Sequence, residues 1–211
     1  MNCLICARED LYQVHNIKRI FYRCKFCGFS FVDPIFYPDI ETQKCRYELH
    51  NNSEKQKGYV DFLSNIIEHA LFYKKNPEKV LDFGSGPNPL TVKLLKERNI
   101  DVYAWDIFFA NESFPAQETF DIVLCIEVAE HFIDPQKDFC DIARTLKQDG
   151  FAFVHTHISP QKDEDFLSWW YIQDITHISF YSKKSLEILA SMNALDLISI
   201  EKEKLSIFKR R

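Results

Sequence analysis

Four cysteines near the start of the chain form two pairs with the spacing of a metal site. Cys3 and Cys6 make one C-x-x-C pair, and Cys24 and Cys27 make the other, seventeen residues further on. This spacing is typical of a four-thiolate zinc site, in which each turn supplies two sulfurs to one tetrahedral ion. Such a site is closed by protein ligands, so its role would be structural. We therefore predict a zinc ribbon over residues 1–34.

A second group of residues has the arrangement of a nucleotide-cofactor site. Asp82 ends an apolar run, and Gly84 and Gly86 follow it ahead of a helix-like segment. Glycines at such a turn let the backbone approach a ligand closely at the carboxyl edge of a parallel sheet. Asp106 ends the next apolar run, about twenty residues later, where a carboxylate can accept hydrogen bonds from both ribose hydroxyls. We predict that these four residues and Ile107 contact a cofactor.

A cluster of acids and a histidine follows the next apolar run. Glu130 and His131 lie three and four residues after Glu127, a spacing that would bring all three to one face of a helical turn at the sheet's carboxyl edge. Histidine titrates near neutral pH and can take a proton from a hydroxyl group. We take His131 and Glu130 as catalytic candidates and Glu127 as a further cofactor contact. The alternative is that His131 bonds a backbone carbonyl while both glutamates face water.

A long aromatic segment at 169–181 provides the second candidate base. It carries Asp174, Thr176 and His177 among tryptophan, tyrosine and phenylalanine side chains, and it is too long for a simple connection. Long connections of this kind often form lids over a site. We therefore predict His177 as a catalytic base. The alternative is an aromatic packing patch in which Asp174 caps a turn.

Alternating strand and helix patterns must position these groups. Periodicity predicts strands at 79–83, 100–105, 120–126 and 150–157 and helices at 90–98, 136–147 and 183–192, after an amphipathic helix that ends near residue 76. Strands separated by helices imply right-handed crossovers, so the predicted fold is α/β with a Rossmann-like, mostly parallel sheet. The runs 194–200 and 205–209 predict a C-terminal antiparallel hairpin, although the charged residues 201–204 are a poor turn signature.

The sheet is expected to be reduced at its third strand. Only thirteen residues separate Asp106 from Phe120, too few for the helix and strand that normally intervene in such a fold. Phe108, Phe109 and Phe114 could cover the cofactor's base on this side, with ordinary core packing as the alternative. A partner subunit or the amphipathic helix could also complete the pocket.

The strand, glycine turn and second acid together resemble the class I S-adenosylmethionine-dependent methyltransferases. The run L-D-F-G-S-G at 81–86 matches the family's D/E-x-G-x-G motif, and the likeness extends over about residues 78–158. It implies S-adenosylmethionine as the cofactor, with Asp106 on its ribose and the acid and glycines of the motif on its methionine part. A zinc ribbon joined to this domain is also a combination seen in that broad family.

Two further runs resemble families with known kinds of acceptor. The E-x-x-E-H run at 127–131 resembles ubiquinone-pathway O-methyltransferases, in which such acids and the histidine are linked with a divalent cation, here expected to be Mg²⁺, and with deprotonation of the acceptor. The D-x-T-H-x-x-F-Y run at 174–181 resembles many small-molecule and sugar-linked methyltransferases. Together they imply O-methylation of a small-molecule or sugar-linked acceptor.

Composition and charge limit the classes of partner and the cellular location that we expect. A formal net charge of −5 lacks the Lys/Arg excess that general affinity for nucleic acid requires. Neither a basic leader nor an apolar run of membrane-spanning length is visible, so we expect a cytoplasmic protein without a membrane span. The sequence carries no signal for an oligomeric state. Two alternatives stay open, a zinc-ribbon RNA methyltransferase and a catalytically degenerate cofactor-binding interaction module.

The expected organisation has three parts. A zinc ribbon occupies residues 1–34, a linker with the amphipathic helix occupies 35–77, and the S-adenosylmethionine-binding methyltransferase domain occupies 78–211. In this arrangement all candidate contacts to cofactor and acceptor belong to the third part, and the ribbon has only a structural role.

Overall fold

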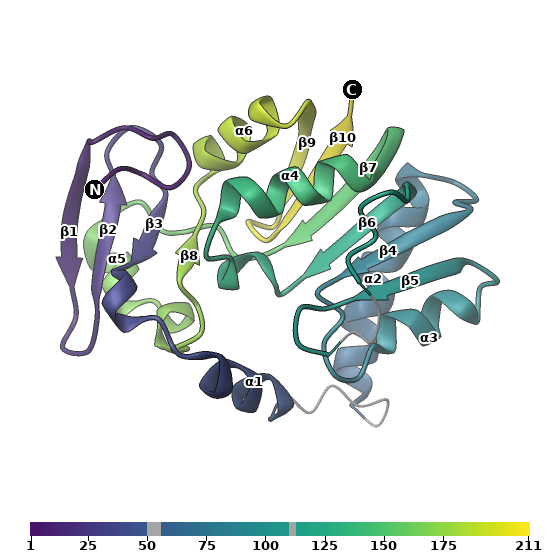
Figure 1. The fold of residues 1–211 in the computed structure, drawn as a ribbon, viewed down its shortest axis with the longest axis horizontal. Coiled ribbons are helices and arrows are strands. Elements are labelled where there is room, and N and C mark those ends of the chain that lie inside the picture. Colours follow the sequence, from purple (N-terminus) through teal and green to yellow (C-terminus); the bar gives the residue numbers. More distant parts are fainter. Residues whose placement is uncertain (50–55, 110–112) are drawn as a thin grey trace.

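The larger of two sheets is Rossmann-like and mostly parallel (Figure 1). The structure, a computed structural model, describes residues 1–49, 56–109 and 113–211. The strands of this sheet are β4 (Lys79–Phe83), β5 (Asp101–Trp105), β6 (Phe120–Ile126), β7 (Leu146–His155), β9 (Leu195–Glu201) and β10 (Leu205–Arg210), in the order β5-β4-β6-β7-β10-β9. Strands β5, β4, β6 and β7 pair in parallel, whereas β10 is antiparallel to β7 and β9. The predicted sheet and its C-terminal hairpin are confirmed.

Strand β5 forms one edge of this sheet. No strand follows it before β6 within the described residues 107–109 and 113–119, so the expected reduction at the third strand is confirmed for that part of the chain. Phe114 lies here with its ring centroid 6.2 Å from that of Phe83 and 5.0 Å from that of Trp105. It therefore belongs to the hydrophobic core and does not face the cofactor side.

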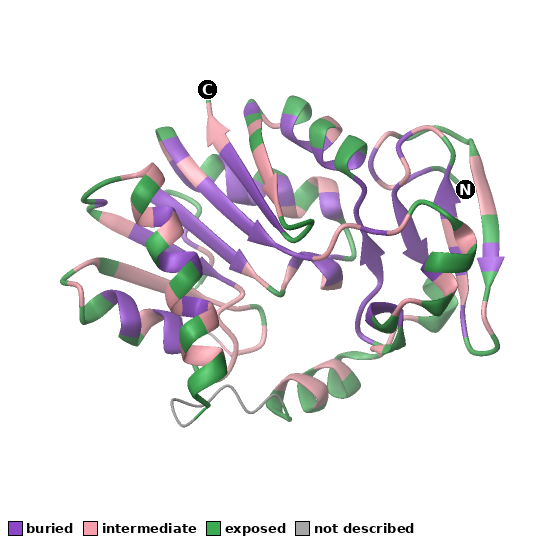
Figure 2. Ribbon diagram, turned by 180° about the vertical axis from the view of Figure 1, so that it is seen from behind, coloured by how far each residue is buried: buried purple, intermediate pink, exposed green. Residues whose placement is uncertain are grey.

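Helices cover both faces of the larger sheet because strand side chains alternate between the faces. The helices are α2 (Lys57–Tyr73), α3 (Leu90–Lys96), α4 (Pro135–Thr145) and α6 (Lys183–Met192). Val80 and Ile122 pack with α2 and α3, whereas Leu81 and Val123 pack with α4 and α6. The central strands are buried along most of their length (Figure 2). The two hydrophobic layers hold the carboxyl ends of the parallel strands in fixed positions.

Three N-terminal strands and one later strand form the smaller sheet. These are β1 (Leu11–His15), β2 (Ile20–Cys24), β3 (Ser30–Val32) and β8 (Ser179–Phe180), in that order. Strand β8 belongs to the aromatic segment, and its Ser179 and Phe180 pair with Phe31 and Ser30 of β3. Tyr171 of the same segment is also buried. The segment expected to form a lid is therefore largely a packing patch built onto the N-terminal sheet.

Arg19, in the turn between β1 and β2, joins the N-terminal sheet to this segment. Its side chain is buried, and its guanidinium donates hydrogen bonds to the carbonyl oxygens of Ile172, Asp174, Ile175 and His177. A planar guanidinium carries five donors, so one arginine can satisfy several carbonyls of an irregular loop. The position of the His177 backbone consequently depends on a residue of the N-terminal sheet.

Helix α1 (Ile40–Glu48) crosses between the two sheets (Figure 1). None of its residues is buried. Arg46 donates a hydrogen bond of 2.7 Å to Asp174, and the ring centroid of Tyr47 lies 5.1 Å from that of His131. These contacts hold α1 against the residues that follow β6 and β7, where it forms one wall of the cleft described below.

Several element bounds differ from their predictions by one to four residues, and the largest differences are at the start of β7 and the end of α2. Strand β7 starts at Leu146, four residues before the predicted start, because Leu146 pairs with Phe120 of β6 and so ends α4 at Thr145. Helix α2 ends at Tyr73, three residues before the predicted end. Short helices α5 (Asp163–Ser168), η1 (Pro34–Phe36), η2 (Ala129–His131) and η3 (Trp170–Gln173) complete the described elements. No helix in the described part of the chain has the length and apolarity needed to cross a bilayer.

The β9–β10 hairpin turns through two charged residues. Lys202 has a φ of 48° and Glu203 a φ of 55°. Positive φ at both central residues is the pattern of a type I′ turn, which favours asparagine and glycine. The hairpin forms despite this unfavourable turn chemistry because β10 also pairs with β7 over five residue pairs.

Candidate active site and metal site

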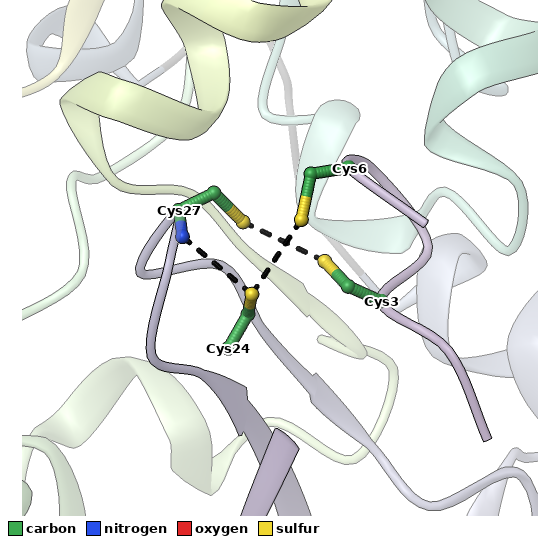
Figure 3. Close-up of side chains that lie close together, drawn as sticks. All are labelled: Cys3, Cys6, Cys24 and Cys27. Atoms are coloured by element: carbon green, nitrogen blue, oxygen red, sulfur yellow. Dashed lines mark hydrogen bonds between the residues drawn. The ribbon is translucent and has the colours of Figure 1, made fainter. Parts of the chain in front are cut away.

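The four N-terminal cysteines converge as the spacing predicts (Figure 3). The Sγ atoms of Cys3 and Cys27 are 3.5 Å apart and those of Cys6 and Cys24 are 3.6 Å apart, and all four lie within 4.8 Å of one another. Sulfurs bound tetrahedrally at about 2.3 Å from zinc lie about 3.8 Å apart. The arrangement of the donor atoms therefore fits a single four-thiolate ion.

A cleft with a volume of about 1210 Å³ runs along the carboxyl edge of the larger sheet. Its walls include the loops after β4, β5, β6 and β7, together with parts of α1 and α2. In open α/β sheets, ligands bind outside the carboxyl ends of the parallel strands. The predicted cofactor and catalytic residues all line this cleft, namely Asp82, Gly84, Gly86, Asp106, Ile107, Glu127, Glu130, His131 and His177.

The glycine turn is fixed by the end of β5 and by Val128. The backbone N–H groups of Gly84 and Ser85 donate to the carbonyl oxygen of Trp105, at 2.7 and 3.0 Å. Gly84 has a φ of 81°, and a Cβ added there would lie 2.5 Å from a methyl carbon of Val128. A glycine is required at this position by both its backbone conformation and the neighbouring side chain.

Gly86 meets a different requirement. Its φ is 68°, yet a Cβ placed on it would have no atom within 4 Å, so the space beside it is open to the cleft. Its N–H donates to Asp106 Oδ2 at 2.9 Å, and Oδ1 of the same carboxylate accepts from the N–H groups of Phe108 and Phe109. Asp106 is thereby held at the cleft beside the Gly86 backbone, which carries no side chain. This is the position that the sequence predicts for a ribose-binding acid.

Asp82 lies under the same turn. It is 4% exposed, and no hydrogen bond reaches its Oδ2 atom. Burial, with the charge of Asp106 adding to it, raises the pKa of Asp82 to about 7. A buried carboxyl with one oxygen left without a partner favours a positively charged ligand group nearby. The glycine turn, the unpartnered Asp82 oxygen and the oriented Asp106 together fit a cofactor with a cationic end and a ribose.

Glu127 follows β6, but its side chain does not lie with those of Glu130 and His131. Its φ of 56° directs the chain sharply at this point, and its Oε1 lies 2.5 Å from Nδ1 of His155. Its backbone N–H also donates to the carbonyl oxygen of His155. The predicted common face with Glu130 and His131 is therefore absent, because Glu127 has a left-handed backbone and lies outside the short helix η2 that carries the other two.

Glu130, His131 and His177 form a cluster on the α1 side of the cleft. One carboxylate oxygen and one ring nitrogen from each histidine lie within 4.8 Å of one another. Nδ1 of His131 donates to the carbonyl oxygen of Thr176, and Nδ1 of His177 donates to that of Tyr171, both at 2.8 Å. His131 thus makes the carbonyl bond of the alternative interpretation, but Glu130 is fully buried and does not face water.

The surroundings of this cluster disfavour a positive charge on His177. Burial, opposed by the nearby Glu130 carboxylate, lowers the pKa of His177 to about 4. Burial also raises the pKa of the neighbouring Tyr171 well above its ordinary value, with the charge of Glu130 adding to the effect. His177 is consequently a neutral imidazole near pH 7, with its free lone pair on Nε2.

Two residues near the end of β7 complete the site and carried no predicted role. His155 pairs with Glu127, and His157 lies with its ring 4.7 Å from Tyr171. Burial lowers the pKa of His157 to about 4. Their only signal in the sequence is their position at the end of a predicted strand, because the contact from β7 to the end of β6 joins residues with no regular spacing.

Comparison with known proteins decides the family. Residues 54–200 match a family model described as a methyltransferase domain. The chain belongs to the class I methyltransferase family. A curated relative, the uncharacterized methyltransferase YcgJ of Bacillus subtilis strain 168, is 33% identical over 100 residues, which are 46% of this chain and 40% of the relative. The region of this chain that matches YcgJ thus spans about two fifths of the length of YcgJ.

Solved structures share the fold of this methyltransferase at low sequence identity. An O-methyltransferase family protein from Burkholderia thailandensis superposes with a TM-score of 0.54 and 12% identity, over 80% of this chain and 62% of that one. The PH0226 protein from Pyrococcus horikoshii OT3 superposes with a TM-score of 0.50 and 15% identity, over 79% and 98% of the two chains. At these identities the likeness is one of fold.

Proposed function

We propose that this methyltransferase transfers the methyl group of S-adenosylmethionine to an oxygen of a small-molecule or sugar-linked acceptor. The observation that carries the proposal is the unit formed by Gly86 and Asp106. An oriented carboxylate lies there beside a glycine whose missing side chain leaves open space in the cleft. A ribose hydroxyl can approach such a carboxylate without meeting a side chain.

The cofactor's remaining groups are assigned to the neighbouring residues. Asp82 faces the positive end of the methionine part, where its unpartnered oxygen gains a counter-charge. Ile107, which is 75% exposed on the cleft rim, and Phe108 lie on the side of the adenine. Glu127 follows β6, next to Val128 and the glycine turn. The sulfonium itself carries the activation for methyl transfer, so the protein mainly supplies alignment.

The acceptor is proposed to bind between the ends of β6 and β7. His131 and His177 both present an unoccupied Nε2 lone pair there, since their Nδ1 atoms already donate to carbonyl oxygens. Such a lone pair can take the proton of an acceptor hydroxyl as the methyl group is transferred. His155, oriented by the Glu127 carboxylate, adds a third imidazole in the same cleft. The ring of Tyr47, with its centroid 5.1 Å from that of His131, favours an acceptor that carries a ring.

The first test is calorimetric titration with S-adenosylmethionine and with its demethylated product. We expect Asp106→Ala to lose binding. The matched control is Asp101→Ala, because Asp101 is an exposed acid at the opposite end of the same strand. Equal binding by wild type and Asp106→Ala would overturn the cofactor site. Once an acceptor has been found by screening, His131→Ala and His177→Ala should each reduce turnover while cofactor binding persists.

The cysteine cluster is proposed to hold a structural zinc ion. The sulfur separations support this proposal, and zinc would compensate for the small hydrophobic core of the N-terminal sheet. Metal analysis of the purified protein should find one zinc per chain that Cys24→Ser removes. Retention of that zinc in the variant would contradict the assignment.

A further inference from the structure

Glu130 is the least satisfied charged group in the described part of the chain. Its relative exposure is 0%, and neither carboxylate oxygen has a hydrogen-bond partner. It also forms no ion pair there with lysine, arginine or histidine within 4.0 Å. A carboxyl group stays ionised in such a place only if something compensates for its charge. Its polar neighbours include the Tyr171 hydroxyl and the His177 ring, and both are uncharged near pH 7.

The two nearest histidines are prepared as metal ligands. Both Nδ1 atoms donate to backbone carbonyls, those of Thr176 and Tyr171, at 2.8 Å. A metal-bound histidine commonly makes this kind of second bond, because it fixes the tautomer and the ring orientation. Nε2 of each ring is left with a lone pair and no described hydrogen-bond partner. The two rings also pack edge to face, with centroids 4.9 Å apart.

We infer that Glu130, His131 and His177 form a second metal site, separate from the cysteine cluster, for a divalent transition ion that favours imidazole ligands. Their three ligand atoms already lie within 4.8 Å of one another. Ligands bound at about 2.0–2.2 Å from one ion lie roughly 3.0–3.6 Å apart, so the three groups need to close by at most about 1–2 Å. The ion supplies the positive charge that Glu130 lacks.

The donor set decides the kind of ion. Two imidazoles and one carboxylate suit zinc, iron, cobalt or nickel, whereas Mg²⁺ prefers oxygen ligands and retained water. The Mg²⁺ expected by resemblance therefore does not fit these residues. The ligands also differ from the three residues of the E-x-x-E-H run. Glu127 is not among them, because its side chain pairs with His155. His177 takes its place and comes from a segment 46 residues after His131.

This inference rests on the proposed function and refines it. Three protein ligands leave open positions on the ion, and those positions face the cleft where the acceptor is placed. An acceptor oxygen bound there would lose its proton more readily, because a metal ion lowers the pKa of a bound hydroxyl. His131 and His177 then act as ligands, and His155 remains the imidazole free to receive the proton.

Cobalt titration of zinc-loaded protein tests the site. The protein is first brought to one zinc per chain at the cysteines, and Co²⁺ is then added while the visible spectrum and bound metal are measured. We expect one further cobalt per chain, with ligand-field bands and without the intense near-ultraviolet absorption of a cobalt thiolate. His177→Gln and Glu130→Gln should weaken its binding by at least about tenfold. Millimolar Mg²⁺ should not compete.

Glu127→Gln is the matched control because it alters the other glutamate of the same five-residue run. Its cobalt affinity should stay within about twofold of wild type. Absence of a second cobalt, or loss of binding in Glu127→Gln with retention in His177→Gln, would overturn the site. If Glu130→Gln does not fold, nuclear magnetic resonance of cobalt-loaded wild type tests the site instead. Hyperfine-shifted ring protons of His131 and His177 would support it, and their absence would overturn it. Cofactor calorimetry on the same samples separates failure of this site from failure of the proposed function.

Discussion

The two glycines of the cofactor turn should respond differently to the same substitution. Gly84→Ala forces a left-handed φ on alanine, which costs about 1–2 kcal/mol, and places a methyl group 2.5 Å from Val128. Overpacking of this kind adds about 1–3 kcal/mol. Gly86→Ala carries a similar φ but meets no atom within 4 Å. We expect unfolding free energies lowered by about 2–5 kcal/mol for Gly84→Ala and by only about 1–2 kcal/mol for Gly86→Ala.

Cofactor affinity should show the opposite order. The added methyl group of Gly86→Ala occupies the open space beside Asp106, so its dissociation constant for S-adenosylmethionine should rise at least about tenfold, or by about 1.4 kcal/mol. Folded Gly84→Ala should bind closer to wild type. Chemical denaturation measures the first quantity and calorimetry the second. Each variant is compared with wild type at the same zinc content, because metal loss would also change stability.

A double-mutant cycle isolates the Val128 contact. A Val128→Ala background removes the two methyl carbons at 2.5 and 2.6 Å and leaves only the Val128 Cβ at 3.1 Å. The penalty of Gly84→Ala should therefore fall toward the backbone part, about 1–2 kcal/mol, whereas the penalty of Gly86→Ala should not change. Equal destabilisation by both glycine substitutions, or normal cofactor binding by Gly86→Ala, would refute the reasoning. If the Gly84→Ala penalty were the same with valine and with alanine at position 128, Val128 would not be the group that excludes a side chain at position 84.

Three other measurements follow from the fold and the site. Replacing Lys202 and Glu203 by Asn and Gly should raise the unfolding free energy by about 1–2 kcal/mol, because both residues hold left-handed φ, and unchanged stability would argue against that turn. Burial raises the pKa of Asp82 to about 7, so the folded state holds a proton that the unfolded state releases above about pH 4. Stability should therefore fall as pH rises through this window, and a denaturation series on Asp82→Asn should lack that part of the fall. Chelation of zinc should speed amide hydrogen exchange in β3 and β8 before it does so in β6, whereas a uniform change would contradict local dependence on the ion.

Local pattern was sufficient for the elements that recur with a regular period. Strand β6 and helix α6 have the predicted bounds, because β6 carries the apolar run Ile122–Ile126, and α6 has an amphipathic pattern and begins at a serine cap. The meeting of Asp106 with Gly86 was also predictable, since parallel neighbouring strands bring their carboxyl ends together. The four cysteines were found from spacing alone because one metal can join only side chains that converge.

The rest depended on contacts between distant segments. Strand β8 has only two residues, so no periodicity marks it, and it forms because β3 offers a free edge. Glu127 and Glu130 diverge because of a positive φ on a glutamate, which sequence spacing does not signal. The pairing of Glu127 with His155, and that of His131 with His177, joins different loops at the sheet edge. Only the folded chain brings these side chains together.

The pairing of β3 with β8 has a consequence for how this protein can change over time. Ser182 Oγ donates to the carbonyl oxygen of Cys27, and a Cβ at Gly28 would approach Ser182 within 3.1 Å, so the second cysteine turn and the end of the aromatic segment fit each other closely. An exchange of the first 34 residues by recombination would separate segments whose surfaces fit each other. Drift in the cysteine-bearing segment is consequently restrained by the loop that carries His177, and the two should be inherited as one unit.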